Sequence, residues 1–205
     1  MSNSKALILF QKRRVRGKVK TRIARTEGNE EALAIYNQLV KYTHKVSSEV
    51  NADVFVFFSE SEPREDIPVG FKEGLQIGKD LGERMSNAFI EILSIGYEKA
   101  ALIGTDCGEL TSEIIENGFD LLNDNEVVFG PADDGGYYLI GMNKPNPDVF
   151  KDIPWSTDQV LSLTKQRAEK KGLTFALLPQ LSDVDTIEDW KRQQKGVLAL
   201  LTEKV

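Results

Sequence analysis

Short apolar runs alternate along this chain with longer segments of helical periodicity. The apolar runs predict strands at residues 6–10, 53–58, 100–103, 127–129, 137–140 and 174–178. Helical spacing and helix-start signals predict helices at residues 30–50, 83–95, 112–123, 157–171 and 187–201. Residues 59–81 contain two prolines and several glycines, which predict a long loop. Strands and helices that alternate in this way indicate an α/β fold whose sheet is mostly parallel.

The segment between residues 129 and 137 is too short to hold a crossover helix. We therefore expect the strands on either side of it to run antiparallel, which would make the sheet mixed. A length of 205 residues suits one domain spanning residues 1–205. No apolar run approaches the length of a membrane span, and no signal-peptide pattern is present at the start. The one cysteine excludes an internal disulfide, so we expect a cytoplasmic protein.

The net charge of −6 is distributed unevenly. Eight basic residues and no acidic residue lie between Lys12 and Arg25, which leaves a balance of −14 in the rest of the chain. A compact positive site on a negative body suits a small anion, whereas a nucleic acid would need an extended basic surface. The charge pattern therefore predicts a small anionic ligand and no nucleic-acid partner.

The basic segment follows the first predicted strand and includes Gly17, Lys18, Lys20 and Arg22. A glycine turn supplies backbone N–H groups and the basic side chains add charge, so this segment is suited to hold phosphate groups. The alternative is a solvated loop of lysines and arginines. Its place directly after the first strand of an α/β sheet favours a phosphate site. Neither the Walker A pattern nor G-x-G-x-x-G is present.

A second candidate site is residues 102–109, LIGTDCGE, where a predicted strand delivers Asp106 at its carboxyl end. A carboxylate there can hold Mg²⁺ or Mn²⁺, although Asp106 or Thr105 could also cap the following helix. Asp185 lies just before the last predicted helix, whose expected N-cap is Thr186, and the acidic string there could serve only to cap that helix. A hard cation usually binds more than one carboxylate, so Asp185 is a candidate partner for Asp106. Cys107 is expected to be a packed residue rather than a nucleophile.

A third candidate site is the acidic tip formed by Asp133, Asp134, Gly135 and Gly136 between two predicted strands. In open α/β sheets, ligands bind at this end of the strands, and glycine permits close approach of a ligand to the backbone. The two carboxylates could bind a metal, contact acceptor hydroxyls or act as a general base. An Asp-Gly hairpin turn without a binding role explains the same residues.

Five motifs, in order, resemble the bacterial DUF2064 family: residues 17–23 (GKVKTRI), 81–89 (LGERMSNAF), 102–110 (LIGTDCGEL), 129–141 (FGPADDGGYYLIG) and 183–189 (DVDTIED). Its members are described as proposed glycosyltransferases or selenodomain-associated transferases of the nucleotide-diphospho-sugar transferase superfamily. The resemblance covers nearly the whole chain. It implies a GT-A fold, a Rossmann-like three-layer α/β/α sandwich with a mixed sheet.

The resemblance also implies roles for individual residues. Gly17, Lys18, Lys20 and Arg22 would hold the nucleotide phosphates, with Thr105, Gly135 and Gly136 completing the nucleotide site. Asp106 and Asp185 would hold Mg²⁺ or Mn²⁺. Lys20 and Arg22 would stabilise charge on the leaving oxygens, and Asp134 would contact or deprotonate the hydroxyl of a small-molecule acceptor. Two departures from the family pattern are Gly108, where proline is usual, and the arginine-rich segment 11–17.

Three functions remain open at this point. One is glycosyl transfer from a nucleotide-diphospho-sugar, which the family description favours. The second is nucleotidyl transfer from a nucleoside triphosphate with release of pyrophosphate. The third is nucleotide binding with weak or no catalysis, suggested by the two departures. The sequence does not specify the base, the sugar, the acceptor or the oligomeric state.

Overall fold

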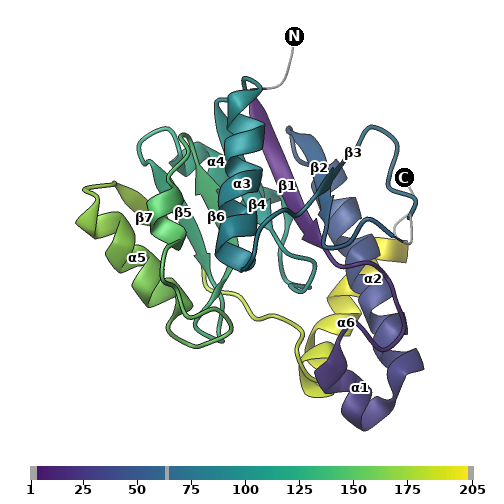
Figure 1. The fold of residues 1–205 in the computed structure, drawn as a ribbon. Helices are drawn as coiled ribbons and strands as arrows, with labels where there is room; N and C mark the ends of the chain where they lie inside the picture. Colours follow the sequence, from purple (N-terminus) through teal and green to yellow (C-terminus); the bar gives the residue numbers. More distant parts are fainter. Residues whose placement is uncertain (1–3, 63–64, 203–205) are drawn as a thin grey trace.

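A seven-stranded sheet forms the centre of the computed structural model, which describes residues 4–62 and 65–202 (Figure 1). In space the strands follow the order β3-β2-β1-β4-β6-β5-β7. In chain order they are β1 (Lys5–Gln11), β2 (Asp53–Phe58), β3 (Lys72–Leu75), β4 (Lys99–Ile103), β5 (Val127–Pro131), β6 (Tyr137–Met142) and β7 (Phe175–Leu177).

The sheet is mixed and mostly parallel, as predicted. Within the described residues, β6 alone runs against the others, pairing antiparallel with both β4 and β5. The expected antiparallel pairing of the strands around the acidic tip is therefore confirmed, with Val128 opposite Gly141. Because the remaining pairs are parallel, the carboxyl ends of β1, β2, β4 and β5 and the start of β6 lie at one edge of the sheet.

Helices cover both faces of the sheet and complete the expected three-layer α/β/α sandwich (Figure 1). Core residues of α2, α4 and α6 pack on one face, and those of α3, α5 and the short 3₁₀ helix η1 pack on the other. The helices are α1 (Thr21–Glu27), α2 (Asn29–Ser48), α3 (Leu81–Ser94), α4 (Ser112–Leu121), η1 (Pro147–Phe150), α5 (Val160–Lys170) and α6 (Ile187–Thr202).

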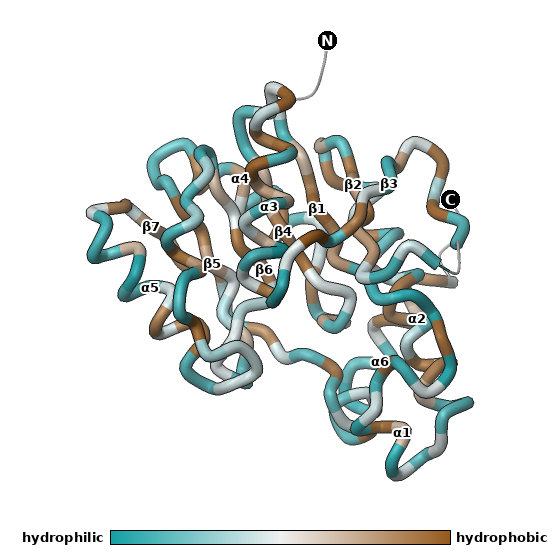
Figure 2. Tube along the Cα trace, viewed as in Figure 1, coloured by the Kyte–Doolittle hydropathy of each residue, from teal (hydrophilic) through white to brown (hydrophobic). Residues whose placement is uncertain are grey.

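The alternation of side chains along β1 divides the core into two layers. Leu7 and Leu9 are fully buried in the layer of α2 and α6, whereas Ala6 and Ile8 are fully buried in the layer of α3. Figure 2 shows hydrophobic residues concentrated along the central strands and polar residues along the outer loops. Burial on both faces explains why the strands read as unbroken apolar runs rather than alternating patterns.

Two regular elements lie where the sequence pattern predicts loops. The helix α1 follows Lys20, which has a left-handed backbone (φ 43°) and makes no side-chain capping bond, so the usual helix-start signal is absent. The edge strand β3 reads KEGL, and three of its four residues are exposed. An exposed edge strand of four residues has no apolar pattern to reveal it.

The starts of α4 and α6 are fixed by hydrogen bonds of Thr111 and Thr186, the residues directly before these helices. Thr111 Oγ1 accepts a bond from Ile114 N at 3.4 Å, and Thr186 Oγ1 accepts one from Asp189 N at 3.3 Å. The Asp189 carboxylate in turn accepts a bond from Thr186 N at 2.8 Å, which makes a reciprocal cap. Within the described part of the chain, no helix is long and apolar enough to cross a bilayer.

Candidate functional site

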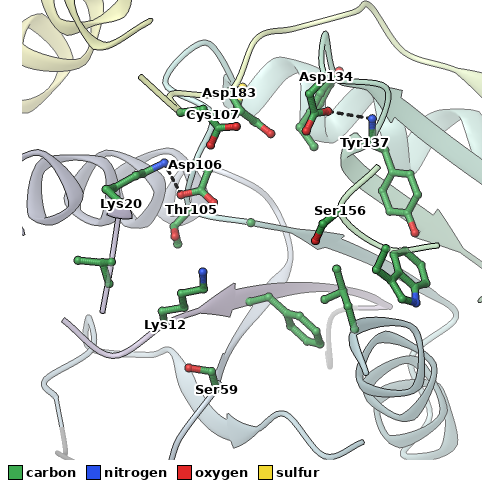
Figure 3. Close-up of a pocket in the computed structure, with 18 of the residues that line it drawn as sticks. Lys12, Lys20, Ser59, Thr105, Asp106, Cys107, Asp134, Tyr137, Ser156 and Asp183 are labelled. Atoms are coloured by element: carbon green, nitrogen blue, oxygen red, sulfur yellow. Dashed lines mark hydrogen bonds and ion pairs between the residues drawn. The ribbon is translucent and has the colours of Figure 1, made fainter. Parts of the chain in front are cut away.

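A cavity of about 530 Å³ opens at the carboxyl edge of the sheet, where the predicted motifs meet. Its wall includes most of the residues assigned from the sequence: Lys18, Lys20, Arg22, Thr105, Asp106, Asp134, Gly136 and Asp185. Three others, Gly17, Asp133 and Gly135, are absent from its lining. Figure 3 shows Lys12, Lys20 and Asp106 toward one end of the cavity and Tyr137 and Ser156 toward the other, with Asp134 and Asp183 between.

Lys20 is the most constrained basic residue of the site. Its side chain is only 5% exposed, and its Nζ lies 2.6 Å from Asp106 Oδ1 and donates to Val184 O at 2.5 Å. A non-glycine residue with φ of 43° stores backbone strain, which persists only where the surrounding contacts hold it. Burial alone would raise the pKa of Asp106, but the charge and hydrogen bond of Lys20 outweigh it and lower that pKa.

The segment before α6 brings the last motif to the cavity. Val184 N donates to the backbone oxygen of Asp106 at 2.8 Å, so this segment lies against the end of β4. In Figure 1 it is the yellow-green stretch that leads from the sheet to α6. Asp185 then pairs with Arg22 Nη1 at 2.6 Å, although the Arg22 side chain is exposed and that of Asp185 partly exposed. The two carboxylates predicted as metal ligands are thus each paired with a basic residue of the predicted phosphate site.

Tyr36 of α2 ties the loop after β1 to the end of β4. Its hydroxyl accepts a bond from Lys12 N at 3.0 Å, donates to Lys12 O at 2.9 Å, and accepts from Thr105 Oγ1 at 3.3 Å. Burial raises the pKa of this phenol far above its usual value, so it stays protonated. Sequence reasoning placed Tyr36 only in the helical pattern and gave it no role at the site.

At the acidic tip, the turn expected under the alternative without a binding role is present. The hairpin turn is present: Gly136 N donates to Asp134 Oδ1 at 2.8 Å, and Gly135 has φ of 86°. Asp134 nevertheless also lines the cavity. Gly135 permits close approach of the chain's own backbone, because a Cβ there would lie 2.2 Å from Asp158 O. Asp133 is exposed and accepts a bond from Gln180 Nε2 at 2.7 Å.

Asp183 is a cavity residue that sequence reasoning missed. Burial, and then the neighbouring charge of Asp106, raise the pKa of its carboxyl to about 7. The signal was its place two residues before Asp185 in the same acidic string. Cys107 is buried, and burial raises the pKa of its thiol to about 12, in keeping with the expected packing role.

Only part of the basic segment faces the cavity. Lys12, Lys18, Lys20 and Arg22 line it. Arg13 instead lies 3.4 Å from the ring centre of Phe58 and pairs with Glu73 at 3.1 Å, with its side chain 2% exposed. The compact positive site expected from the sequence is therefore divided between cavity-facing and structural residues.

The far end of the cavity contains residues that the sequence did not single out as a site. Arg84 and Met85 come from the first turns of α3, and Trp155 and Ser156 come from the segment before α5. Together with Tyr137, these residues give this end two aromatic rings, a thioether, the hydroxyl of Ser156 and one guanidinium.

Comparison with known protein families finds the same family that the sequence motifs resemble. A family model described as an uncharacterized protein conserved in bacteria (DUF2064) matches residues 42–157. The chain belongs to the DUF2064 family. Among proteins with curated functions, none matches it.

Solved structures similar to this DUF2064 protein extend the comparison to the whole chain. A proposed nucleotide-diphospho-sugar transferase from Desulfovibrio desulfuricans G20 is 30% identical, with a TM-score of 0.86 over 98% of this chain and 94% of that one. The inositol-1-phosphate CTP transferase of T. maritima is 14% identical, with a TM-score of 0.62 over 100% and 98%. Rv0371c of Mycobacterium tuberculosis H37Rv, in complex with manganese, is 10% identical, with a TM-score of 0.52 over 95% and 100%.

Proposed function

We propose that this protein is a transferase that uses a nucleotide-activated donor, and that it moves a glycosyl group from a nucleotide-diphospho-sugar to a small-molecule acceptor. The observation that carries this proposal is the convergence of Lys20, Arg22, Asp106, Asp134 and Asp185 on one cavity. These residues come from separate parts of the chain. The similarity to the Desulfovibrio protein, proposed to be a nucleotide-diphospho-sugar transferase, supports the donor class.

The basic end of the cavity is suited to the donor's diphosphate. Lys12 lines it and makes no ion pair within residues 4–62 and 65–202, so its charge is available to a ligand. Lys20 and Arg22 are already placed by their carboxylate partners, which lowers the cost of ordering them when the donor binds. In our proposal these two side chains stabilise the charge that builds on the leaving diphosphate.

The donor set also suits a divalent cation, Mg²⁺ or Mn²⁺. Asp106 and Asp185 supply the hard oxygen ligands that such ions prefer, and Asp183 adds a third carboxylate beside them. Within the described residues, however, no three acidic, histidine or cysteine side chains already converge on one point. When bound, such an ion would neutralise diphosphate charge. The manganese complex of the similar Rv0371c structure supports a test for metal dependence.

We infer that Asp134 acts on the acceptor. One of its carboxylate oxygens is fixed by the N–H of Gly136, and the side chain lines the cavity between the basic and aromatic ends. A carboxylate held in this way can accept the proton of an attacking hydroxyl. We assign Asp134 the role of contacting, and of deprotonating, the acceptor hydroxyl.

Nucleotidyl transfer is the second candidate function. It is favoured by the CTP transferase of T. maritima, whose similarity covers the whole chain. The third alternative, binding without catalysis, was suggested partly by Gly108. Gly108 has a packing role here: its N–H donates to Gln193 Oε1 at 2.9 Å.

The two chemistries differ in the leaving group, so product identity separates them. The purified protein is incubated with nucleotide-diphospho-sugars, or with nucleoside triphosphates plus sugar phosphates, in Mg²⁺, Mn²⁺ or EDTA. Release of a nucleoside diphosphate supports glycosyl transfer, whereas release of pyrophosphate supports nucleotidyl transfer. Asp134→Asn should lower turnover strongly, while Asp133→Asn, a neighbour outside the cavity lining, should not. Failure of every nucleotide both to react and to raise the melting temperature would overturn the proposal.

A further inference from the structure

The aromatic end of the cavity is not used by the proposed donor chemistry. This end includes Met85, Tyr137 and Trp155, with the Tyr137 hydroxyl 3.9 Å from Met85 Sδ and Arg84 next to Met85 on α3. It lies beyond Asp134 from the basic segment, as the positions of Lys20 and Tyr137 in Figure 3 show. A mainly apolar pocket with one charged group can pack against an apolar part of a ligand and pair with one charge on that ligand.

Arg84 differs from the paired basic residues of the cavity. Lys18, Lys20 and Arg22 each have a carboxylate partner. Arg84 makes no ion pair within residues 4–62 and 65–202, and its one side-chain bond there runs from Nε to Gly78 O at 3.2 Å. Its side chain is only partly exposed. A partly buried guanidinium that is oriented but lacks a counter-charge is suited to a ligand oxyanion.

The chain holds Trp155 closely at this end. A Cβ at Gly82 would lie 2.6 Å from Trp155 Cζ2, so the missing side chain on α3 makes room for the indole. The next residue, Ser156, has φ of 67° and also lines the cavity. Strain at a non-glycine residue is often found at ligand sites, and Lys20 shows it at the opposite end of this same cavity.

We propose that Arg84 and Trp155 form the acceptor subsite and that the acceptor carries an oxyanion next to a ring. The oxyanion, a phosphate or a carboxylate, pairs with the guanidinium, and the ring packs on the indole. The name acceptor subsite rests on the proposed transferase function. The binding chemistry itself depends only on the residues at this end.

The test uses probes that separate the ring from the charge. Phenyl phosphate and benzoate carry both features with different oxyanions, benzyl alcohol carries only the ring, and inorganic phosphate carries only the charge. Binding to the full chain is measured by titration calorimetry, and quenching of tryptophan fluorescence reports the location. Phenyl phosphate or benzoate should bind at least tenfold more tightly than benzyl alcohol. Whichever of phenyl phosphate and benzoate binds more tightly identifies the oxyanion that this end prefers.

Two variants and a control locate the interaction. Arg84→Gln should weaken binding of the better probe by about tenfold or more and leave benzyl alcohol unchanged. Trp155→Phe should abolish the quenching. Arg25→Gln removes the same charge from an exposed position outside the cavity lining and should change neither. Equal binding by Arg84→Gln and the unaltered protein, or no binding of either ring-bearing anion at millimolar concentrations, would overturn the proposal.

Failure of the acceptor-subsite proposal can be distinguished from failure of the proposed function. Arg84→Gln should retain any melting-temperature increase caused by a nucleotide, because Lys20 and Arg22 are unchanged. If no nucleotide reacts or shifts the melting temperature but Arg84-dependent probe binding persists, the transferase assignment fails and the anion site stands. If nucleotides bind but displace the better probe competitively, the probe occupies the donor end and the acceptor subsite is refuted.

Discussion

Gly108 offers the sharpest test of how the loop after β4 is packed. Proline is usual at this position in the family motif, yet here the N–H of Gly108 donates to Gln193 Oε1 at 2.9 Å. Gln193 lies on α6 and is only 5% exposed. A Cβ at position 108 would lie 2.7 Å from that Oε1 and 2.8 Å from Val197 Cγ2. Any side chain here must therefore displace the ends of these two α6 side chains.

The expected costs follow from these contacts. Gly108→Ala forces the overlap, which costs about 1–3 kcal/mol, partly offset by about 0.4–1 kcal/mol from the stiffer unfolded chain. Gly108→Pro also removes the N–H and leaves Gln193 Oε1 without that donor, which adds about 1–3 kcal/mol. Urea denaturation should therefore rank the original protein above Gly108→Ala and Gly108→Pro below both.

A double-mutant cycle with Gln193→Ala identifies the cause. With Oε1 absent, the hydrogen bond and the closest overlap are both gone, so Gly108→Pro should cost less by about 0.5–3 kcal/mol. If Gly108→Pro is as stable as the original protein, or costs the same in both backgrounds, the reasoning about this contact is refuted.

Three further predictions concern other parts of the molecule. Burial and the charge of Arg14 lower the pKa of His44 to about 4, below its unfolded value, so stability is lost as pH falls; between pH 7 and 5 the loss should be about 2 kcal/mol by urea denaturation. Tyr36→Phe removes a buried hydroxyl with three hydrogen bonds and should cost about 1–3 kcal/mol in the same assay. Gly135→Ala combines a positive φ with a severe overlap at Asp158 and should cost about 2–5 kcal/mol, seen as a lower melting temperature.

Each of these has a matched comparison. The pH-dependent loss should shrink in His44→Gln, and an unchanged slope would assign it to other groups. Tyr36→Phe should also weaken nucleotide binding, since the loop carrying Lys12 is held by this hydroxyl; Tyr42→Phe, whose hydroxyl bonds to Leu110 O away from the cavity lining, should not. Gly172→Ala has a similar positive φ but nothing within 4 Å, so equal losses at both glycines would argue against the overlap.

Most of the fold could be predicted because its strands are buried on both faces. β2 was predicted with its observed bounds, since five of its six residues are buried and the run is wholly apolar after Asp53. The antiparallel β5–β6 pair followed from the short connection between them. In contrast, α1 begins at a left-handed lysine without a cap, and β3 is a charged edge strand, so neither has a local signal.

The site was predictable only as far as each motif reveals its own chemistry. The place of Asp106 at a strand end and the spacing of Asp185 identified both as candidates, and both line the cavity. The pairing of Lys20 with Asp106 joins residues 86 positions apart, and no local pattern encodes it. Arg84 and Trp155 belong to different elements that approach only in the folded chain, which is why the aromatic end was missed.

The late position of Asp183 and Asp185 has a consequence for synthesis. All seven strands precede residue 178, so a chain that stopped before residue 183 would contain every strand of the sheet. It would still lack two cavity carboxylates and the Val184 carbonyl that accepts a bond from Lys20. Because chains emerge from the ribosome amino end first, the binding site can be completed only after nearly all of the polypeptide has been made. A prematurely terminated product would thus contain every strand of the sheet but not the complete cavity.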